Sequence, residues 1–387
     1  MPSMMKFVLP VLAAAGAAQA ECSVSATTTI QNQGDVAAMT TCSTFSGSIA
    51  IATGTTDDIA IGGIKHLAGN LVAPANSNIK RIGASDLVNI TGEMNFDGLT
   101  SLRGVDFPVL KNVSSIKWNA LPVLQNIGFT ASVEAAKKIS IENTGVRTLE
   151  GINIVMADTI KVANNPYINK IQMQLGNVSN ALDFSDNNKD VEIELTNLIW
   201  ATNLTFRSVG SISLPSLTKL NGSLGIYTSG FESFAAPNLT EVAKALAIVG
   251  NDKMSNLSLP LLAKVSENLQ VANNSALEEV QLPKLESIRG AFDISGNMSK
   301  VETPNLKSVS GAFNLQTSSE FDCKFFQNLK NKKLIEGKYY CNGSLSNPDV
   351  AGGSTPKGQT GNKSAASTIS TANAALGLAA MAAIFLL

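Results

Sequence analysis

Few side chains in this chain of 387 residues could carry out chemistry. The chain has a single histidine, His66, which excludes catalysis or metal binding by several histidines. His66 follows the segment Ile-Gly-Gly-Ile-Lys, and we expect it in an exposed loop between repeats. The sequence has no phosphate-binding loop, zinc-type spacing or nucleophile elbow. We therefore predict no catalytic residue, no metal site and no cofactor.

The four cysteines lie near the two ends of the chain. Cys22 and Cys42 share one terminal segment, and Cys323 and Cys341 share the other. Four cysteines allow three pairings, and the two local pairs are favoured because each keeps to one segment. Free or metal-bound thiols are the alternative. Disulfides would require an oxidising compartment.

Asparagine sequons offer a second kind of chemistry, which is N-glycosylation in the secretory pathway. Chance produces some sequons in a chain rich in Asn and Ser, so each is a candidate only. The candidates are Asn89, Asn112, Asn177, Asn203, Asn221, Asn238, Asn256, Asn273, Asn297, Asn342 and Asn362.

The formal net charge of −1 argues against nucleic acid as a partner.

The first 20 residues are typical of a secretory signal peptide. Lys6 precedes an apolar run that ends in the small-x-small pattern Ala18-Gln19-Ala20, so we place cleavage after Ala20. A buried N-terminal helix is the alternative interpretation.

The last residues are typical of a GPI-attachment signal. Residues 374–387 are apolar to the final leucine, and as a helix they would rise ~21 Å, short of a hydrocarbon core of ~30 Å. A polar spacer and small residues precede them, with Asn362 or Ser364 as the expected attachment residue and Gly361 as a further candidate. The tail would be removed, and the protein would contact the membrane only through its GPI lipid.

Between these ends, a pair of apolar residues recurs every 20 to 23 residues. The first member of each pair is Ile49, Leu71, Met94, Ile116, Ile139, Ile160, Leu182, Leu204, Leu224, Leu246, Leu269, Phe292 or Phe313. The second stands two residues later and is Ile51, Ala73, Phe96, Trp118, Ile141, Val162, Phe184, Phe206, Ile226, Ile248, Val271, Ile294 or Leu315. The residue between them is mostly small or polar, as in a strand with one buried face. Trp118 is therefore expected in the core.

One strand per repeat, always in the same direction, predicts a parallel sheet of stacked coils. We predict an all-β, right-handed parallel β-solenoid of about 13 coils. Proline, which cannot donate to a ladder, is expected at corners. The proline corners are Pro108, Pro122, Pro215, Pro237, Pro260, Pro283 and Pro304, and aliphatics that follow them, such as Leu285 and Ile288, should point inward.

A second corner is expected just after each strand, where Asn or Asp recurs. Asparagine tolerates left-handed backbone there and could pair along the axis. These residues are Asn143, Asn164, Asp186, Asn251, Asn273 and Asn297. We expect this row to be structural rather than a binding site.

An open solenoid needs caps at both ends. We divide the chain into a signal peptide (1–20), an N-terminal disulfide cap (21–45), the solenoid (46–315), a C-terminal disulfide cap (316–343), a Ser/Thr/Gly-rich linker with the attachment region (344–373) and the removed tail (374–387). Phe326 and Leu329 have helical spacing and predict an amphipathic lid on the last coil.

The Pro-x-Leu-x-x-Val units with cysteine caps resemble the receptor L-domain, a leucine-rich-repeat-like β-helix. The closing residues Cys323, Phe326, Leu329, Ile335, Gly337, Tyr339 and Cys341 complete a second likeness. Together with the signal peptide and the GPI tail, they make the chain resemble the fungal GPI-anchored cell-wall organisation proteins of the extracellular-mutant/sporulation-specific family. The resemblance implies a place at the outer leaflet of the plasma membrane and in the cell wall, a role in wall integrity, and no catalytic residues.

Three functions are considered, and we predict the first of them. The first is a non-enzymatic surface glycoprotein that binds wall β-glucan, chitin or mannoprotein, although the outward residue between the apolar pairs is never aromatic. The second is a glycan-active enzyme, which needs two carboxyl groups about 5 Å or roughly 6.5–9.5 Å apart. Asp183 and Asp293 have no acidic neighbour in that outward row, and acids such as Asp57-Asp58 and Glu278-Glu279 are expected in turns. The third is a receptor-like ligand binder.

Overall fold

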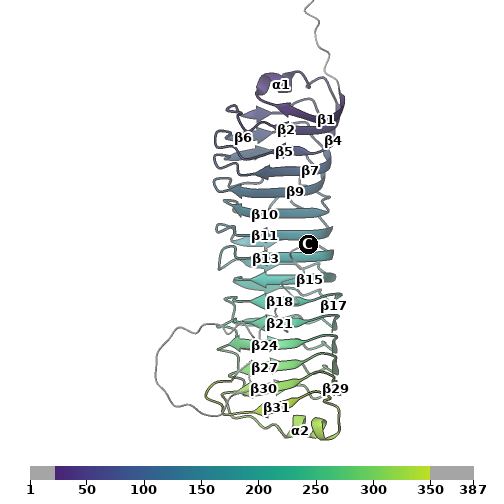
Figure 1. The fold of residues 1–387 in the computed structure, drawn as a ribbon, viewed down its shortest axis with the longest axis vertical. Helices are drawn as coiled ribbons and strands as arrows, with labels where there is room; N and C mark the ends of the chain where they lie inside the picture. The colour runs from purple at the N-terminus through teal and green to yellow at the C-terminus, as the bar shows by residue number, and fades with distance from the viewer. Residues whose placement is uncertain (1–21, 349–387) are drawn as a thin grey trace, which may run out of the picture.

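The computed structural model describes residues 22–348, which form one long stack of parallel coils (Figure 1). The predicted signal peptide, the attachment candidates Gly361, Asn362 and Ser364, the sequon at Asn362 and the apolar tail lie outside the described residues. The all-β parallel solenoid is confirmed. No helix among residues 22–348 is long and apolar enough to cross a membrane.

One face of every coil contributes to a single large parallel sheet. Its strands are β1 (Ser23–Ile30), β2 (Thr44–Ile51), β4 (His66–Ala68), β5 (Leu71–Ala73), β7 (Asn89–Asp97), β9 (Asn112–Leu121), β10 (Lys138–Thr144), β11 (Met156–Ala163), β13 (Asn177–Ser185), β15 (Trp200–Arg207), β17 (Lys219–Leu220), β18 (Leu224–Tyr227), β20 (Glu241–Val242), β21 (Leu246–Val249), β23 (Lys264–Val265), β24 (Leu269–Asn274), β26 (Ser287–Ile288), β27 (Phe292–Gly296), β29 (Ser308–Val309), β30 (Phe313–Thr317) and β31 (Tyr339–Asn342).

Three small parallel sheets form part of the opposite side of the stack. They are β3 (Ile59–Ala60) with β6 (Arg81–Gly83) and β8 (Gly104–Asp106), then β12 (Lys170–Gln172) with β14 (Glu192–Glu194) and β16 (Ser211–Ser213), and finally β19 (Ser233–Ala235) with β22 (Asn256–Ser258), β25 (Glu279–Gln281) and β28 (Lys300–Glu302).

The solenoid has about 15 turns, so the expected 13 coils are slightly too few. The extra coils are at the ends, where β1 pairs with β2 and β31 pairs with β30. Sequence analysis assigned these segments to caps alone. Both add a strand because the exposed backbone groups of an open sheet edge need hydrogen-bond partners.

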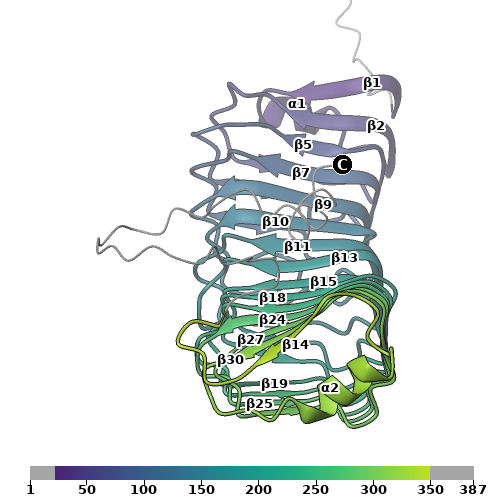
Figure 2. The same ribbon diagram turned by 60° about the horizontal axis from the view of Figure 1, so that its bottom comes forward.

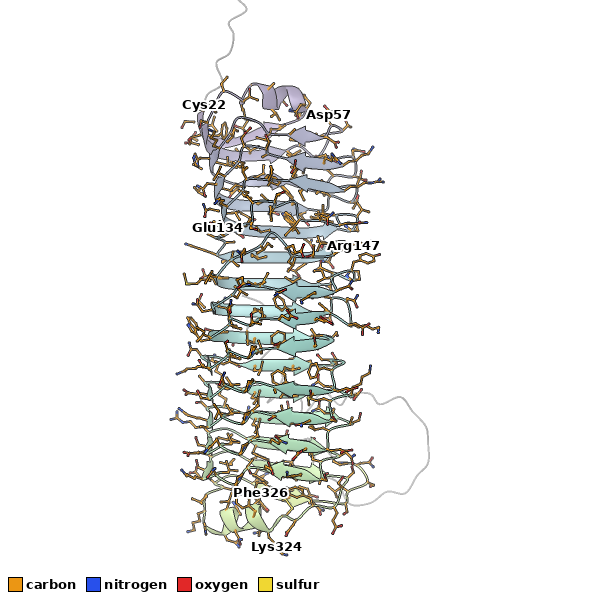
Figure 3. The ribbon with its side chains drawn as sticks, turned by 180° about the vertical axis from the view of Figure 1, so that it is seen from behind. Cys22, Asp57, Glu134, Arg147, Lys324 and Phe326 are labelled. Carbon is orange, nitrogen blue, oxygen red and sulfur yellow. A yellow bond between two sulfur atoms is a disulfide. The ribbon has the colours of Figure 1, made fainter. Side chains whose placement is uncertain are left out.

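Local predictions about loops needed two corrections. His66 is exposed as expected, but it is the first residue of β4 rather than part of a loop. Glu279 begins β25 rather than lying in a turn, because its backbone pairs with Asn256 and Lys300 on neighbouring coils. Asp57 and Asp58 lie outside the strands, and Asp57 points away from the coil (Figure 3).

The two apolar files predicted from the sequence line the interior. Phe292 pairs with Phe313 and Ile294 pairs with Leu315 in successive strands, and all four are buried. Trp118 is also buried and stacks on Phe96 with ring centroids 5.8 Å apart. Stacking equivalent positions on neighbouring coils places large apolar side chains in contact along the axis.

The corners also follow the sequence. The motif prolines lie in turns, and Leu285 and Ile288, which follow Pro283, are fully buried. Positive φ is found at Asn143, Asn164, Asp186 and Asn273. Asn251 and Asn297 do not share it, because Gly250 and Gly296 already supply the positive φ in their coils.

Asn251 instead belongs to a buried row one residue further along, with Asn165, Asn187 and Asn274. Its Oδ1 accepts from the Ser229 N–H at 2.9 Å, and its Nδ2 donates to the Asn274 Oδ1 at 3.1 Å. These amides replace backbone hydrogen bonds that the corner interrupts. Asparagines therefore pair along the axis in this inner row, whereas no two of the six predicted corner residues form a side-chain hydrogen bond with each other.

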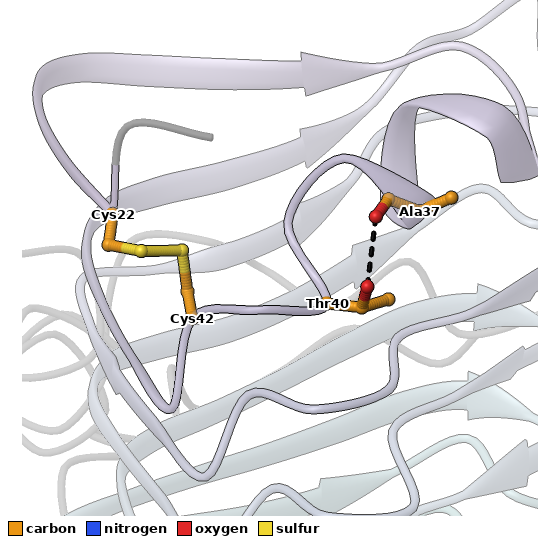
Figure 4. The surroundings of a disulfide bond; sticks show 4 residues. All are labelled: Cys22, Ala37, Thr40 and Cys42. Atoms are coloured by element: carbon orange, nitrogen blue, oxygen red, sulfur yellow. Dashed lines mark hydrogen bonds between the residues drawn. A yellow bond between two sulfur atoms is a disulfide. The ribbon is translucent and has the colours of Figure 1, made fainter. Parts of the chain in front are cut away.

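Disulfides and short helices close the two ends. Figure 2 shows both helices, and Figure 4 shows the Cys22–Cys42 disulfide. Cys22 is bonded to Cys42 beside α1 (Gln33–Ala37), and Cys323 is bonded to Cys341. The amphipathic lid is α2 (Lys324–Asn331), whose buried residues are Phe326 and Leu329. The Phe326 ring lies 4.9 Å from that of Phe313, so α2 covers the last apolar layer.

Candidate functional site

The outward face of the large sheet from β13 to β30 carries two rows of side chains, which we call the outer strip. The first row lies between the two buried files and comprises Asp183, Thr205, Gly225, Ala247, Gln270, Asp293 and Asn314. The second row lies two residues further along each strand and comprises Ser185, Arg207, Tyr227, Val249, Ala272, Ser295 and Gln316.

Tyr227 is an aromatic residue on this face that sequence analysis missed, because it considered only the first row. Its ring lies against Gly225, where an added Cβ would be 2.5 Å from Cε2 and 2.7 Å from the hydroxyl oxygen. The sequence signal for this arrangement is a glycine two residues before the tyrosine in a strand with one exposed face. Gly225 therefore lets the Tyr227 ring lie along the sheet.

Arg207 lies next to Tyr227 on the neighbouring strand, with its guanidinium carbon 4.8 Å from the ring centroid. A guanidinium at this distance attracts the ring face and restrains both side chains. Burial raises the pKa of the Tyr227 hydroxyl, while the Arg207 charge acts in the opposite direction. Tyr227 is therefore a neutral hydrogen-bonding group over the physiological pH range.

A cluster of charges lies at one end of the outer strip. Burial raises the pKa of the Asp183 carboxyl, although the Ser185 hydroxyl donates a hydrogen bond to it. Burial also opposes ionisation of Glu142, but hydrogen bonds from Lys161 at 2.7 Å and Ser140 at 2.7 Å outweigh it, and the pKa of Glu142 is lowered. Opposite shifts of two nearby carboxyl groups occur at catalytic sites as well as in structural networks.

A ladder of amides and one carboxylate lies at the other end. Gln270 donates to Asp293 at 3.3 Å, Asn314 donates to the other Asp293 oxygen at 2.8 Å, and Gln316 donates to the Asn314 Oδ1 at 3.0 Å. Asp293 and Asn314 are buried, while Gln270 and Gln316 are half-buried. The two glutamines thus form the accessible polar groups of this end.

Between the two ends, the outer strip has small or apolar side chains at Gly225, Ala247, Val249 and Ala272. Gly225, Ala247 and Ala272 are buried, so the accessible groups are the Tyr227 ring, Val249, the glutamine amides and the Arg207 guanidinium. Together they match a sugar, which has apolar C–H surfaces and many hydroxyl groups. Each of these groups also lies on a regular strand, so the spacing along the strip repeats with the coils at ~4.8 Å.

No sequon asparagine belongs to the two rows from β13 to β30, although Asn342 in β31 continues the second row beside Gln316. Asn89, Asn112, Asn177 and Asn256 begin strands β7, β9, β13 and β22, and Asn203 is inside β15. Asn221, Asn238 and Asn297 lie in bends or turns, and Asn273 and Asn342 are in β24 and β31. An N-glycan would therefore not be attached to the outer strip itself.

A shallow surface hollow of about 330 Å³ lies where the small sheets are interrupted between β8 and β12. Its lining includes Asn126, Thr130, Thr148 and Glu150. Glu150 is its only charged lining residue, and we assign it no function. Across residues 22–348 no group of three or more His, Cys, Asp or Glu side chains is arranged to hold a metal ion.

Comparisons with known proteins identify relatives of the whole chain. Residues 3–40 match the family model of Ecm33, described as a GPI-anchored cell wall organization protein. The chain is 38% identical to "Protein ecm33" of Aspergillus fumigatus over 91% of its own length and 89% of that protein. It is 36% identical to a "Cell surface GPI-anchored protein" of Arthroderma benhamiae over 96% of its own length and 95% of that protein.

A more distant relative is "Sporulation-specific protein 2" of Saccharomyces cerevisiae, which is 29% identical over 83% of this chain and 64% of that protein. No solved structure matches. The names of these relatives mention no reaction. Because identity above 30% extends over nearly the full length of two relatives, the chain belongs to the Ecm33 family of fungal GPI-anchored cell wall organization proteins.

Proposed function

We propose that this protein is a GPI-anchored glycoprotein of the cell surface and wall that organises the wall by binding glycan without cleaving it. The outer strip is the binding site, and the observation that carries the proposal is Tyr227, held along the sheet by Gly225 and Arg207. The names of the relatives support the location and the process. The anchor follows from the GPI signal, with Asn362 or Ser364 as the attachment residue.

The ligand is a neutral wall polysaccharide, either β-glucan or chitin, or the glycan of a mannoprotein. Its apolar C–H surfaces pack on Tyr227 and Val249, and its hydroxyl groups bind Arg207, Thr205 and Gln270. Because the coils repeat along the axis, several sugar units of one chain bind equivalent positions in succession. The absence of sequon asparagines from both rows supports this choice of face.

A binding assay with purified polymers tests this proposal. The secreted protein is incubated with β-glucan, chitin and mannan, and bound protein is measured after sedimentation. Tyr227→Ala should weaken retention on the preferred polymer ~5- to ~150-fold, since loss of a stacking residue costs ~1–3 kcal/mol. Tyr167→Ala is the matched control, because Tyr167 is exposed but lies outside the outer strip. Equal retention of all three proteins would contradict the assignment of the site.

A glycan-active enzyme is the second candidate, favoured by the opposite pKa shifts of Glu142 and Asp183. Against it, Lys161 already binds Glu142, which leaves that carboxylate a poor base. The same incubations decide between the two. Unchanged polymer length supports a binder, whereas shortened or rearranged products that disappear in Asp183→Asn would establish an enzyme.

A further inference from the structure

An apolar patch interrupts the polar surface at the start of strands β11 and β15. Met156, Val155 and Ile199 have exposed fractions of 64%, 58% and 53%, which makes them three of the four most exposed large hydrophobic residues in the described part of the chain. The half-buried Trp200 follows Ile199. Contiguous exposed apolar side chains on a soluble domain require a covering partner or reduce its solubility.

Asn177 lies in the middle of this patch. It pairs with Met156 on one side and with Trp200 on the other in the parallel ladder, so its neighbours are ~4.8 Å away on each side. Ala157, Val178 and Ala201, which follow these three residues, are buried, so Met156, Asn177 and Trp200 all point outward. The preceding residues Val155, Gly176 and Ile199 are joined by hydrogen bonds of 2.8 Å between successive coils.

Asn177 is also the first residue of the sequon Asn177-Val178-Ser179. Its side-chain amide makes no hydrogen bond to another of the described residues, so a substituent on it disturbs no contact of the fold. Asn203 differs, because its Nδ2 donates to the Asn180 oxygen at 3.2 Å and its Oδ1 accepts from the Ser223 N–H at 3.0 Å. Of the two sequon asparagines Asn177 and Asn203, only Asn177 has a side-chain amide that is not used in a hydrogen bond within the described residues.

We propose that Asn177 carries an N-linked glycan whose first sugars cover the apolar patch formed by Val155, Met156, Ile199 and Trp200. In the transfer step, the Asn177 Nδ2 forms a bond to the anomeric carbon of a lipid-pyrophosphate-linked oligosaccharide. The bond from that carbon to the pyrophosphate oxygen breaks, the nitrogen loses one proton, and the lipid pyrophosphate leaves.

A glycan has both the apolar C–H faces and the polar hydroxyl groups that are needed to cover this apolar patch in water. The C–H face of the first sugar packs on the Trp200 indole and the Met156 thioether, and its hydroxyl groups remain in water. Beyond Trp200 the ladder continues with Lys219, which forms an ion pair with Glu241 at 3.1 Å and gives the patch a polar border. The inference rests on the secretory route of the proposed function but not on its binding site.

Tryptophan fluorescence gives a direct test, because the chain has two tryptophans and Trp118 is fully buried. A small polar quencher therefore reports on Trp200. The full chain is expressed in a fungal host and released from its anchor by phosphatidylinositol-specific phospholipase C, and occupancy of each sequon is measured by mass spectrometry of peptides. Asn177 should be occupied, and both Asn177→Gln and Ser179→Ala should increase quenching and self-association. Asn112→Gln is the matched control, since Asn112 also begins a strand but pairs with Asn89 and Ala135.

Each outcome is decisive. Unmodified Asn177 in a protein glycosylated at other sequons overturns this inference alone, whereas absence of glycan at every sequon contradicts the secretory route itself. An occupied Asn177 whose removal leaves Trp200 quenching unchanged shows that the glycan does not cover the patch. A wild-type dimer with unmodified Asn177 and a protected Trp200 assigns the patch to a second copy of the chain.

Discussion

At the scale of single residues, the pKa of each carboxyl group at the end of the outer strip depends on its burial and on the groups that bind it. Asp183 and Glu142 face the same side of the sheet, yet their pKa values move in opposite directions. The difference lies in their partners. Glu142 has the Lys161 ammonium at 2.7 Å, whereas the Ser185 hydroxyl does not compensate the burial of Asp183.

This difference predicts opposite effects of pH. A raised folded-state pKa means that Asp183 costs stability once the pH exceeds its ordinary value of 3.8, so Asp183→Asn should stabilise the fold near neutral pH and have little effect in acid. A lowered pKa means that Glu142 contributes stability above its ordinary value of 4.5, which is lost as the pH falls. Glu142→Gln should therefore destabilise near neutral pH.

Urea unfolding midpoints of both variants across this pH range check the prediction. Thr205→Ser, on the same face but without a titrating group, is the control. Shifts of equal sign in the two variants would show that the pKa directions are not set by the partners named above.

At the scale of one coil, the corner after each long strand decides how well the chain turns. The corner residue has φ near +56° at Asn143, Asn164 and Asn273, which asparagine accepts. At the same corner, Thr228 has a φ of 48°. A β-branched residue in left-handed backbone is strained, because its side chain crowds the following carbonyl.

Exchanging the two residue types should therefore change stability in both directions. Thr228→Asn should raise the free energy of unfolding by about 1 kcal/mol, and Asn164→Thr should lower it by about 1 kcal/mol. Chemical denaturation of the two variants measures both values. Both side chains are exposed, so altered packing offers no alternative account. A destabilised Thr228→Asn variant would refute the assignment of strain.

At the scale of the whole molecule, each coil touches only its neighbours, so stability is expected to spread from coil to coil. The ends have a neighbour on one side only and depend on their caps. At the C-terminal end, the disulfide Cys323–Cys341 holds α2 and β31 over Phe313. Loss of this cap exposes the aromatic rings of the last layers.

Replacing Cys323 and Cys341 by alanine should cost about 3 kcal/mol through the entropy of the closed loop. Because the stack is nearly one-dimensional, the loss should be local. Hydrogen exchange should accelerate in β30, β31 and α2 and remain unchanged near β9. The matched double replacement of Cys22 and Cys42 should affect β1 and β2 instead. Uniform acceleration along all coils would contradict a coil-by-coil model.

The sequence predicted most of the architecture, because each coil of a repeat protein shows the same local pattern of apolar and polar residues. The paired apolar files, the proline corners and the local disulfides all depend on residues close together in the chain. The coil count was low because neither terminal strand has the full apolar pair: Thr28 of β1 aligns with Ile49, and Cys341 of β31 aligns with Leu315. Asn251 was assigned to the wrong corner row because Gly250 precedes it.

Tertiary structure alone determined which side chains surround the two proposed sites. The Tyr227 ring lies next to Arg207. Asn177 lies between Met156 and Trp200. In each case the neighbouring residues are about one coil apart in the sequence. Such neighbours are fixed by the register between coils, which varies with small changes in corner length. The local pattern states that a residue points outward, but only the stacked coils determine which side chain it meets there.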